Sequence, residues 1–259
     1  MILQSVHYIN ENNTGDMQSC PFEHFSVDGE VKKFHIMDIE SVNPEFPVII
    51  GGGGLLQQGP SIDNIEKIIK RHRAPVVIWG AGMNTNGKMH DDHIPDYIKE
   101  ACLAGIRDYA FPGVQWVPCV SCMHPLFDKK YEVKHDVVCF EGNKLDLPYP
   151  TIGCQDGVSM EQILEFLGSA KTIITSSYHG MYWGTLLKRE VIVIPNEASS
   201  KFYHFPFYVP ITSKNYFTSF IGHGVVHNNA VERCRLINNI HARDVSKLLN
   251  IELKYKHSL

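Results

Sequence analysis

The feature that most constrains the fold is a series of apolar segments that end in glycine or small polar residues and alternate with amphipathic segments. The apolar segments include PVVIWGAG at residues 75–82 and TIIT at residues 172–175. Strands that are apolar throughout are typical of parallel sheets with helices on both faces. The segments at 61–72 and 159–170 have the apolar spacing of helices. The sequence therefore predicts an α/β protein built on parallel sheets.

The alternation falls into two groups, which predicts two Rossmann-like halves. We place the first half at residues 1–130 and the second half at residues 131–259, where a long helix at about 228–250 ends the fold. We also expect a helix over residues 91–105, with Gly105 as its stop and a short strand after it.

Composition and charge exclude several classes of partner. The 259-residue chain has a formal net charge of -4, so it has no general attraction for nucleic acid or for anionic membranes. No apolar run approaches the ~20 residues that span a bilayer, and the start MILQSVHYIN lacks the basic region of a signal peptide. Seven cysteines without an even framework favour a reducing compartment. We expect a cytoplasmic protein with at most peripheral membrane association.

One cysteine pair, Cys119 and Cys122, forms a CxxC motif. A zinc site would need a second ligand pair at a definite spacing, and the sequence has none. We interpret the pair as small buried side chains, with a metal or redox role as the alternative. The sequence also lacks an Asp-x-Asp that would hold a divalent ion against a diphosphate. We therefore expect no metal and no cofactor.

The loops beyond the strands are the candidate site, because open parallel sheets bind ligands past the carboxyl ends of their strands. In the first half these loops are rich in glycine and asparagine. The glycines can be interpreted equally well in two ways. They allow a strand, a turn and a helix to pack closely, or they allow a ligand to approach the backbone. Gly80, Gly82 and Gly87 do not match the dinucleotide spacing G-x-G-x-x-G. The cleft candidates are Asn13, Thr14, Gly15, Asp16, Gly52, Gly53, Gly82 and Asn84.

In the second half, the corner TSSYHG at residues 175–180 has more hydroxyl groups than a helix cap requires. His179 lies at a predicted helix N-terminus, where the helix dipole opposes a positive charge. A neutral imidazole can act as a general acid or base. The catalytic candidate is therefore His179, and a packed, capping histidine is the alternative.

The same corner offers donors for an anion, because a helix N-terminus presents free backbone N–H groups. Lys201 and Arg107 would add positive charge, although an exposed ion pair with Asp108 is the alternative for Arg107. The donor-binding candidates are Ser176, Ser177, Gly180, Asn196, Ser200, Lys201 and Arg107.

Six segments of the chain resemble the polysaccharide pyruvyl transferase family in their order and spacing, and the resemblance covers most of the chain. They are NTGDMQSCP, VIIGGGGLL, VVIWGAGMN, GIRDY, TIITSSYHGMYWGTLLKREVIVIP and SSKF. The resemblance implies a GT-B-like arrangement, with the acceptor in the first half and the donor in the second. It also implies transfer of the enolpyruvyl unit of phosphoenolpyruvate to two sugar hydroxyls, with His179 as the acid or base.

The chain departs from the family at one position. The corner of the family reads Ser-Arg-Leu-His-Gly, and here Ser177 stands in place of the arginine. An arginine binds carboxylate or phosphate through two parallel hydrogen bonds, whereas a serine supplies one hydrogen-bond donor and no charge. Either Lys201, Arg107 or another cation replaces it, or the donor is not phosphoenolpyruvate.

Three hypotheses follow for the function. The first is a pyruvyl transferase-like enzyme that uses phosphoenolpyruvate and a glycan or lipid-linked sugar acceptor. The second is a glycosyltransferase of the GT-B type that uses a nucleotide sugar. The third is a non-catalytic carbohydrate-binding relative.

Overall fold

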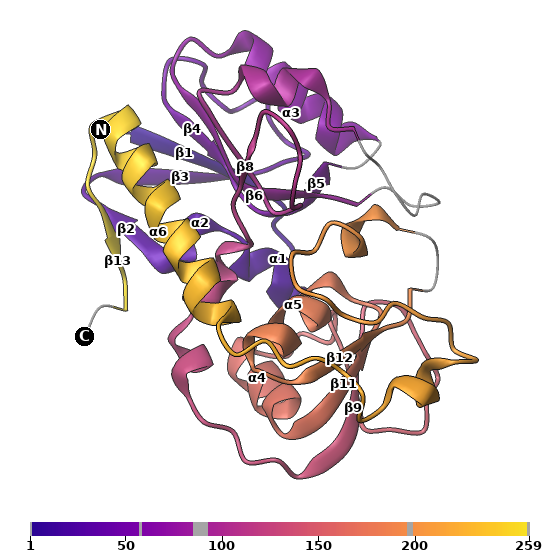
Figure 1. Ribbon diagram of the computed structural model, residues 1–259. Helices are drawn as coiled ribbons and strands as arrows, with labels where there is room; N and C mark the ends of the chain where they lie inside the picture. The colour runs from indigo at the N-terminus through magenta and orange to yellow at the C-terminus, as the bar shows by residue number, and fades with distance from the viewer. Residues whose placement is uncertain (1, 57–58, 85–92, 196–198, 258–259) are drawn as a thin grey trace.

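The computed structural model describes residues 2–56, 59–84, 93–195 and 199–257, and every structural statement below concerns these residues. Most of its strands belong to two parallel sheets (Figure 1). The larger sheet has seven strands in the order β3-β1-β4-β6-β7-β8, with β5 also paired to β6. Its strands are β1 (Ile2–His7), β3 (Glu30–His35), β4 (Val48–Ile50), β5 (Gly53–Leu56), β6 (Val76–Met83), β7 (Leu103–Ile106) and β8 (Gln115–Trp116).

The smaller sheet has four parallel strands in the order β10-β9-β11-β12. They are β9 (His135–Glu141), β10 (Thr151–Gly153), β11 (Ala170–Thr175) and β12 (Glu190–Val193). The first sheet thus lies within residues 2–116 and the second within residues 135–193. This is the mixed α/β architecture with parallel sheets that the sequence predicts. The division of the chain at residue 130 stays a prediction.

In the described parts of the chain, six α-helices and several short 3-10 turns pack with the sheets. The α-helices are α1 (Thr14–Gln18), α2 (Pro21–His24), α3 (Pro60–Arg71), α4 (Met160–Gly168), α5 (Tyr178–Leu186) and α6 (Ala230–Leu249). The 3-10 turns are η1 (Asp96–Glu100), η2 (Val120–Met123), η3 (Pro125–Asp128), η4 (Ser200–Phe202) and η5 (Phe217–Phe220). Among the described residues, no helix combines the length and the apolar character needed to cross a bilayer.

Helix α5 is buried on all sides. Each of its nine residues, YHGMYWGTL, is buried, which agrees with a sequence that has no charged face. A single core cluster includes Trp183 of α5, Trp79 of the first sheet and Phe140 of the second. The two sheets therefore share a hydrophobic core around this helix.

The expected helix over residues 91–105 is wrong for the part of the segment that the structure describes. Residues 96–100 form only the 3-10 turn η1, and Leu103–Ile106 form strand β7 between β6 and β8. Pro95 has no backbone N–H to donate within a helix. Gly105 lies inside the strand, where a Cβ would come within 2.5 Å of Val117 and 2.8 Å of His241. The glycine therefore permits close packing and does not stop a helix.

The last helix crosses from the second sheet back to the first (Figure 1). Asn238 of α6 is fully buried, and its side-chain oxygen accepts from Trp79 Nε1 at 2.8 Å. Its amide nitrogen donates to the carbonyl oxygens of Pro118 and Cys234, each at 3.1 Å. After the helix, β13 (Leu253–Tyr255) pairs antiparallel with β2 (Phe25–Val27). The C-terminal segment thus packs on the N-terminal part of the chain.

We expect Asn238→Ala to lower the free energy of unfolding by about 2 kcal/mol or more, because Trp79 and the Pro118 carbonyl would lose their partner inside the core. Asn239→Ala is the matched control, since Asn239 is exposed on the same helix. Urea denaturation followed by tryptophan fluorescence measures the free energy of unfolding of both variants. Equal stability of the two variants would show that the buried amide does not hold α6 in place.

Candidate functional site

A cavity of about 290 Å3 lies where the carboxyl ends of strands from both sheets converge. The first sheet contributes β5 and the segments after β1, β6 and β7, and the second sheet contributes those after β9 to β12. Parallel sheets bind ligands at this position. The lining residues are Asn13, Asp16, Gly54, Asn84, Arg107, Gly142, Asn143, Cys154, Gln155, Ser177, Tyr178, His179 and Lys201.

The structure brings together site residues that the sequence predicts from both halves. Those that line this cavity are Asn13, Asp16, Asn84, Arg107, Ser177, His179 and Lys201. Asn13 caps helix α1, because its side-chain oxygen accepts from the N–H groups of Gly15 and Asp16 at 3.1 and 3.4 Å. Thr14 does not line the cavity, and its hydroxyl donates to the Val158 carbonyl at 2.5 Å. These contacts hold α1 between the two sheets.

His179 sits in the first turn of α5 and packs against α1. A Cβ on Gly15 would lie 2.2 Å from His179 Nδ1, so only glycine allows the imidazole to occupy this place. The other face of the imidazole packs on Trp183, with ring centroids 4.8 Å apart. His179 is 8% exposed. The glycine of the N-terminal loop thus accommodates the ring of the catalytic candidate.

Burial keeps His179 neutral. Desolvation, followed by the charges of Arg107 and Lys201, lowers its pKa from 6.5 to about 3. The expected direction is therefore confirmed, but burial is the main cause, whereas the sequence suggested the helix dipole. A neutral imidazole at physiological pH can accept a proton from a ligand.

Arg107 is held inside the site by an aromatic ring and a glycine. Its guanidinium carbon lies 3.7 Å from the centre of the Tyr178 ring, and a Cβ on Gly82 would lie 2.0 Å from its Nε. The side chain donates a long hydrogen bond of 3.5 Å to the Met83 carbonyl, and its Nε has no partner among the described residues. Arg107 and Asp108 are each 3% exposed. The alternative of an exposed ion pair between them is therefore wrong.

Lys201 and Asp16 complete the charges around the cavity. Burial and the charge of Arg107 lower the pKa of Lys201. Burial raises the pKa of Asp16 from 3.8 to about 6, although Arg107 opposes this shift. Asp16 is the only carboxylate among the described lining residues, against two cations. The site therefore favours an anionic ligand.

Several predicted site residues have structural positions behind the cavity. Ser176 Oγ accepts from the N–H groups of Gly142 and Asn143, each at 3.0 Å, and donates to the Asn143 carbonyl at 2.6 Å. A Cβ on Gly180 would lie 2.2 Å from Thr175 Oγ1. Ser200 is fully buried at the start of η4. These three residues do not line the cavity, and Asn196 lies outside the described residues.

The glycines of the N-terminal half mainly permit close packing. A Cβ on Gly52 would lie 3.0 Å from the Ser19 carbonyl and 3.2 Å from the Gly80 carbonyl. Gly53 has a φ of +99°, which residues with a side chain rarely adopt. Only Gly54 of this group lines the cavity. Close packing therefore accounts for Gly52, and the backbone conformation accounts for Gly53.

Of the thirteen described lining residues, four lie in loops that the sequence did not identify as part of the site. They are Gly142, Asn143, Cys154 and Gln155, and they follow β9 and β10. Strand β10 is short and half-exposed, so its sequence has no apolar run to mark it. Gly142 and Asn143 follow β9, whose apolar run is visible in the sequence HDVVCFE, and the end of that run was the available signal.

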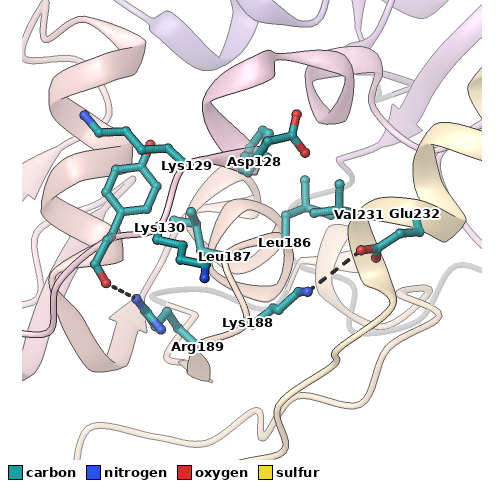
Figure 2. A pocket seen from close by; sticks show the side chains of 11 residues that line it. Asp128, Lys129, Lys130, Leu186, Leu187, Lys188, Arg189, Val231 and Glu232 are labelled. Carbon is teal, nitrogen blue, oxygen red and sulfur yellow. Dashed lines mark hydrogen bonds and ion pairs between the residues drawn. The ribbon is translucent and has the colours of Figure 1, made fainter.

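A larger cavity of about 530 Å3 lies at the opposite ends of the second-sheet strands. Three of the four basic side chains that line it have partners. Arg189 donates to the Tyr131 carbonyl at 3.2 Å, and Lys188 lies 3.8 Å from Glu232 (Figure 2). Lys129 pairs with Glu165 at 2.8 Å. Because the amino ends of parallel strands rarely form ligand sites, we assign the site to the smaller cavity.

The cysteines of the CxxC motif are buried thiols. Cys119 and Cys122 are both free and 0% exposed. Within the described ranges, no group of three or more His, Cys, Asp or Glu side chains could hold a metal ion. Cys119 nevertheless reaches the site, because its Sγ lies 3.7 Å from His179 Nε2.

We expect Asp16→Asn to stabilise the protein at pH 7 by about 1–3 kcal/mol. Because the folded-state pKa of Asp16 is raised, from 3.8 to about 6, its stabilising contribution is present at low pH and is lost as the pH rises through 6. The gain should therefore shrink toward pH 4. Urea denaturation at several pH values measures it.

Asp63→Asn is the matched control for this prediction, because Asp63 lies in the first turn of α3 and is exposed. It should change the stability little at either pH. A destabilised Asp16→Asn protein at pH 7 would show that attraction to Arg107 outweighs the burial of the carboxylate.

No protein-family model and no curated protein matches this chain. Among solved structures, it is similar to a functionally uncharacterized protein from Klebsiella pneumoniae subsp. pneumoniae, with 18% sequence identity and a TM-score of 0.47. The match covers 74% of this chain and 83% of that chain. A similarity of this size carries no argument about function.

Proposed function

We propose that this chain is a pyruvyl transferase-like enzyme that moves the enolpyruvyl unit of phosphoenolpyruvate to hydroxyl groups of a glycan or a lipid-linked sugar. The observation that carries the proposal is the convergence of two cations, the buried Arg107 and the partly buried Lys201, on the cavity that contains the neutral His179. The resemblance of the sequence to the pyruvyl transferase family supports the choice of donor.

The two cations favour a small ligand with more than one negative charge. Burying a charged group is unfavourable unless it is paired, and neither Arg107 nor Lys201 forms an ion pair with a described carboxylate. Their described contacts are to aromatic rings, Tyr178 for Arg107 and Phe202 for Lys201, and to one carbonyl. A ligand that carries a carboxylate and a phosphate would supply the missing counter-charges.

Arg107 compensates for the serine at position 177. Ser177 precedes α5 as its N-cap, and its side chain makes no capping hydrogen bond. Arg107 reaches the same cavity from the first sheet, and its guanidinium lies over the Tyr178 ring. A planar guanidinium binds carboxylate or phosphate through two parallel hydrogen bonds. We infer that Arg107 performs the anion-binding role that the family assigns to the arginine of the corner.

His179 would accept the proton of an acceptor hydroxyl. In the proposed reaction, two acceptor oxygens bond to C2 of the enolpyruvyl unit, and the bond from C2 to the phosphate oxygen breaks. Of the two hydroxyl protons released, one ends on C3, which becomes a methyl group, and the other leaves with phosphate. The product is a cyclic ketal, and no oxidant or reductant is consumed.

The arrangement of the sheets and the size of the cavity agree with this proposal. Strand ends of both parallel sheets face one cavity, as a GT-B-like arrangement requires. A volume of about 290 Å3 is at the lower limit of the ~300–1,000 Å3 usual for ligand pockets. This favours phosphoenolpyruvate over the larger nucleotide sugar of the alternative glycosyltransferase hypothesis.

We expect phosphoenolpyruvate to stabilise the folded protein by about 2.7 kcal/mol at a hundred times its Kd, because it binds only the folded state. Arg107→Met and Lys201→Met should each remove most of this stabilisation, since each removes a charge from the cavity. Arg73→Met is the matched control, because Arg73 pairs with Glu45 on the surface. Thermal unfolding with and without phosphoenolpyruvate measures the stabilisation of the wild type and of the three variants.

Two outcomes of that measurement would contradict the proposal. Stabilisation by a nucleoside diphosphate and not by phosphoenolpyruvate would favour the glycosyltransferase hypothesis. Equal stabilisation of the Arg107→Met protein and the wild type would show that the cavity is not the donor site.

We expect Ser177→Arg to tighten phosphoenolpyruvate binding by about tenfold, because a charge-assisted hydrogen bond contributes about 1.5–3 kcal/mol. Ser177 lines the cavity, so a longer side chain at this position would extend into it. Ser177→Met is the matched control, since it adds comparable length without charge and should weaken binding. Calorimetric titration distinguishes them, and equal weakening by both substitutions would contradict the prediction.

A further inference from the structure

Behind His179, four buried side chains form a continuous line of polar contacts. Trp183 Nε1 donates to Ser121 Oγ at 3.0 Å, and Ser121 Oγ lies 3.2 Å from Cys119 Sγ. Cys119 Sγ lies 3.4 Å from Ser19 Oγ, which donates to the Gly15 carbonyl at 2.7 Å. All four side chains are 0% exposed, so bulk water does not compete for these contacts.

The two ends of this line determine where its hydrogens point. An indole N–H can only donate, and a carbonyl oxygen can only accept. Because Ser121 Oγ accepts from Trp183, its own hydrogen is available to Cys119 Sγ. Because the hydrogen of Ser19 is used by the Gly15 carbonyl, the lone pairs of Ser19 Oγ are available to its other neighbours.

One of those neighbours is His179, whose Nε2 lies 3.4 Å from Ser19 Oγ. An oxygen whose hydrogen is already used acts as an acceptor, so Nε2 must carry a hydrogen to bond with it. A neutral imidazole carries one N–H hydrogen. The hydrogen on Nε2 therefore leaves Nδ1 with a free lone pair.

We propose that Ser19 is a positioning residue that holds His179 in the tautomer with its hydrogen on Nε2, so that Nδ1 is the atom that accepts the proton of a substrate. Nδ1 makes no hydrogen bond with the described residues, whereas Nε2 faces the buried Ser19 and Cys119. That Nδ1 receives its proton from a substrate rests on the proposed function. The tautomer itself follows from the contacts alone.

Cys119 could favour the other tautomer of His179. Its Sγ lies 3.7 Å from His179 Nε2, and a thiol that donated to Nε2 would place the imidazole hydrogen on Nδ1. The contact from Ser19 Oγ is shorter, and a thiol is a weak donor. Ser19 therefore determines the tautomer while it is present, and the thiol would do so if the hydroxyl were removed.

The test is nitrogen-15 NMR of the full chain with labelled histidine, in which the two nitrogens of each imidazole report its tautomer. Comparison with His179→Gln assigns the His179 signals. In the wild type we expect the Nε2–H form. In Ser19→Ala we expect the ratio of the two forms to shift toward Nδ1–H by about tenfold, because one hydrogen bond is lost and another is gained.

Two further variants separate positioning from a general loss of packing. Ser61→Ala is the matched control, because Ser61 is also buried and its hydroxyl donates to a carbonyl, that of Leu55 at 3.1 Å. It should leave the signals of His179 unchanged. Cys119→Ala should keep the Nε2–H form, since Ser19 retains its bond to Gly15. Circular dichroism verifies that each variant is folded.

Three results would overturn the proposal. The first is an Nδ1–H tautomer in the wild type, and the second is an unchanged tautomer in folded Ser19→Ala. The third is a shift of the tautomer ratio toward Nδ1–H in Cys119→Ala. If Ser19→Ala does not fold, the wild-type tautomer and Cys119→Ala still decide the question. Binding of phosphoenolpyruvate is measured separately, so its absence would refute the proposed function without affecting the NMR result.

Discussion

The burial of helix α5 between the two sheets is the constraint on which the rest of the structure depends. A nine-residue helix without an exposed face must be covered on every side. The β11 strand, helix α4, the N-terminal loop and the segment around Cys119 provide this cover. His179 is part of the same helix, so the packing that stabilises the fold also determines where the imidazole lies.

The same burial determines the electrostatics of the site. Desolvation lowers the pKa of His179 and raises the pKa of Asp16, so each group favours its neutral form. The guanidinium of Arg107 lies beside an aromatic ring and close to the backbone, and Arg107 is 3% exposed. A site with one buried and one partly buried cation, and one carboxylate among its described lining residues, is suited to bind an anion. The neutral imidazole that lines the same cavity can accept a proton from a ligand.

The parallel strands could be predicted because their apolar runs are long and end in glycine or polar residues. β6 and β11 are of this kind. The failures concern elements whose sequence is ambiguous or short. Leu103–Ile106 reads equally well as the end of a helix, and only its pairing with β6 and β8 makes it a strand. Strand β10 has only three residues and no apolar run, so its sequence does not mark it as a strand. The lining residues that follow it could therefore not be identified from the sequence.

The sequence by itself determined which loops follow strands, and from this it identified His179, Arg107, Lys201 and Asp16 as candidates for one site. This was possible because the carboxyl ends of parallel strands lie at one edge of a sheet. Only the tertiary structure decided that Ser176 holds a loop, while Ser19 and Cys119 contact the imidazole. Such contacts join residues up to 160 positions apart, and no local pattern of residues encodes a distance of that kind.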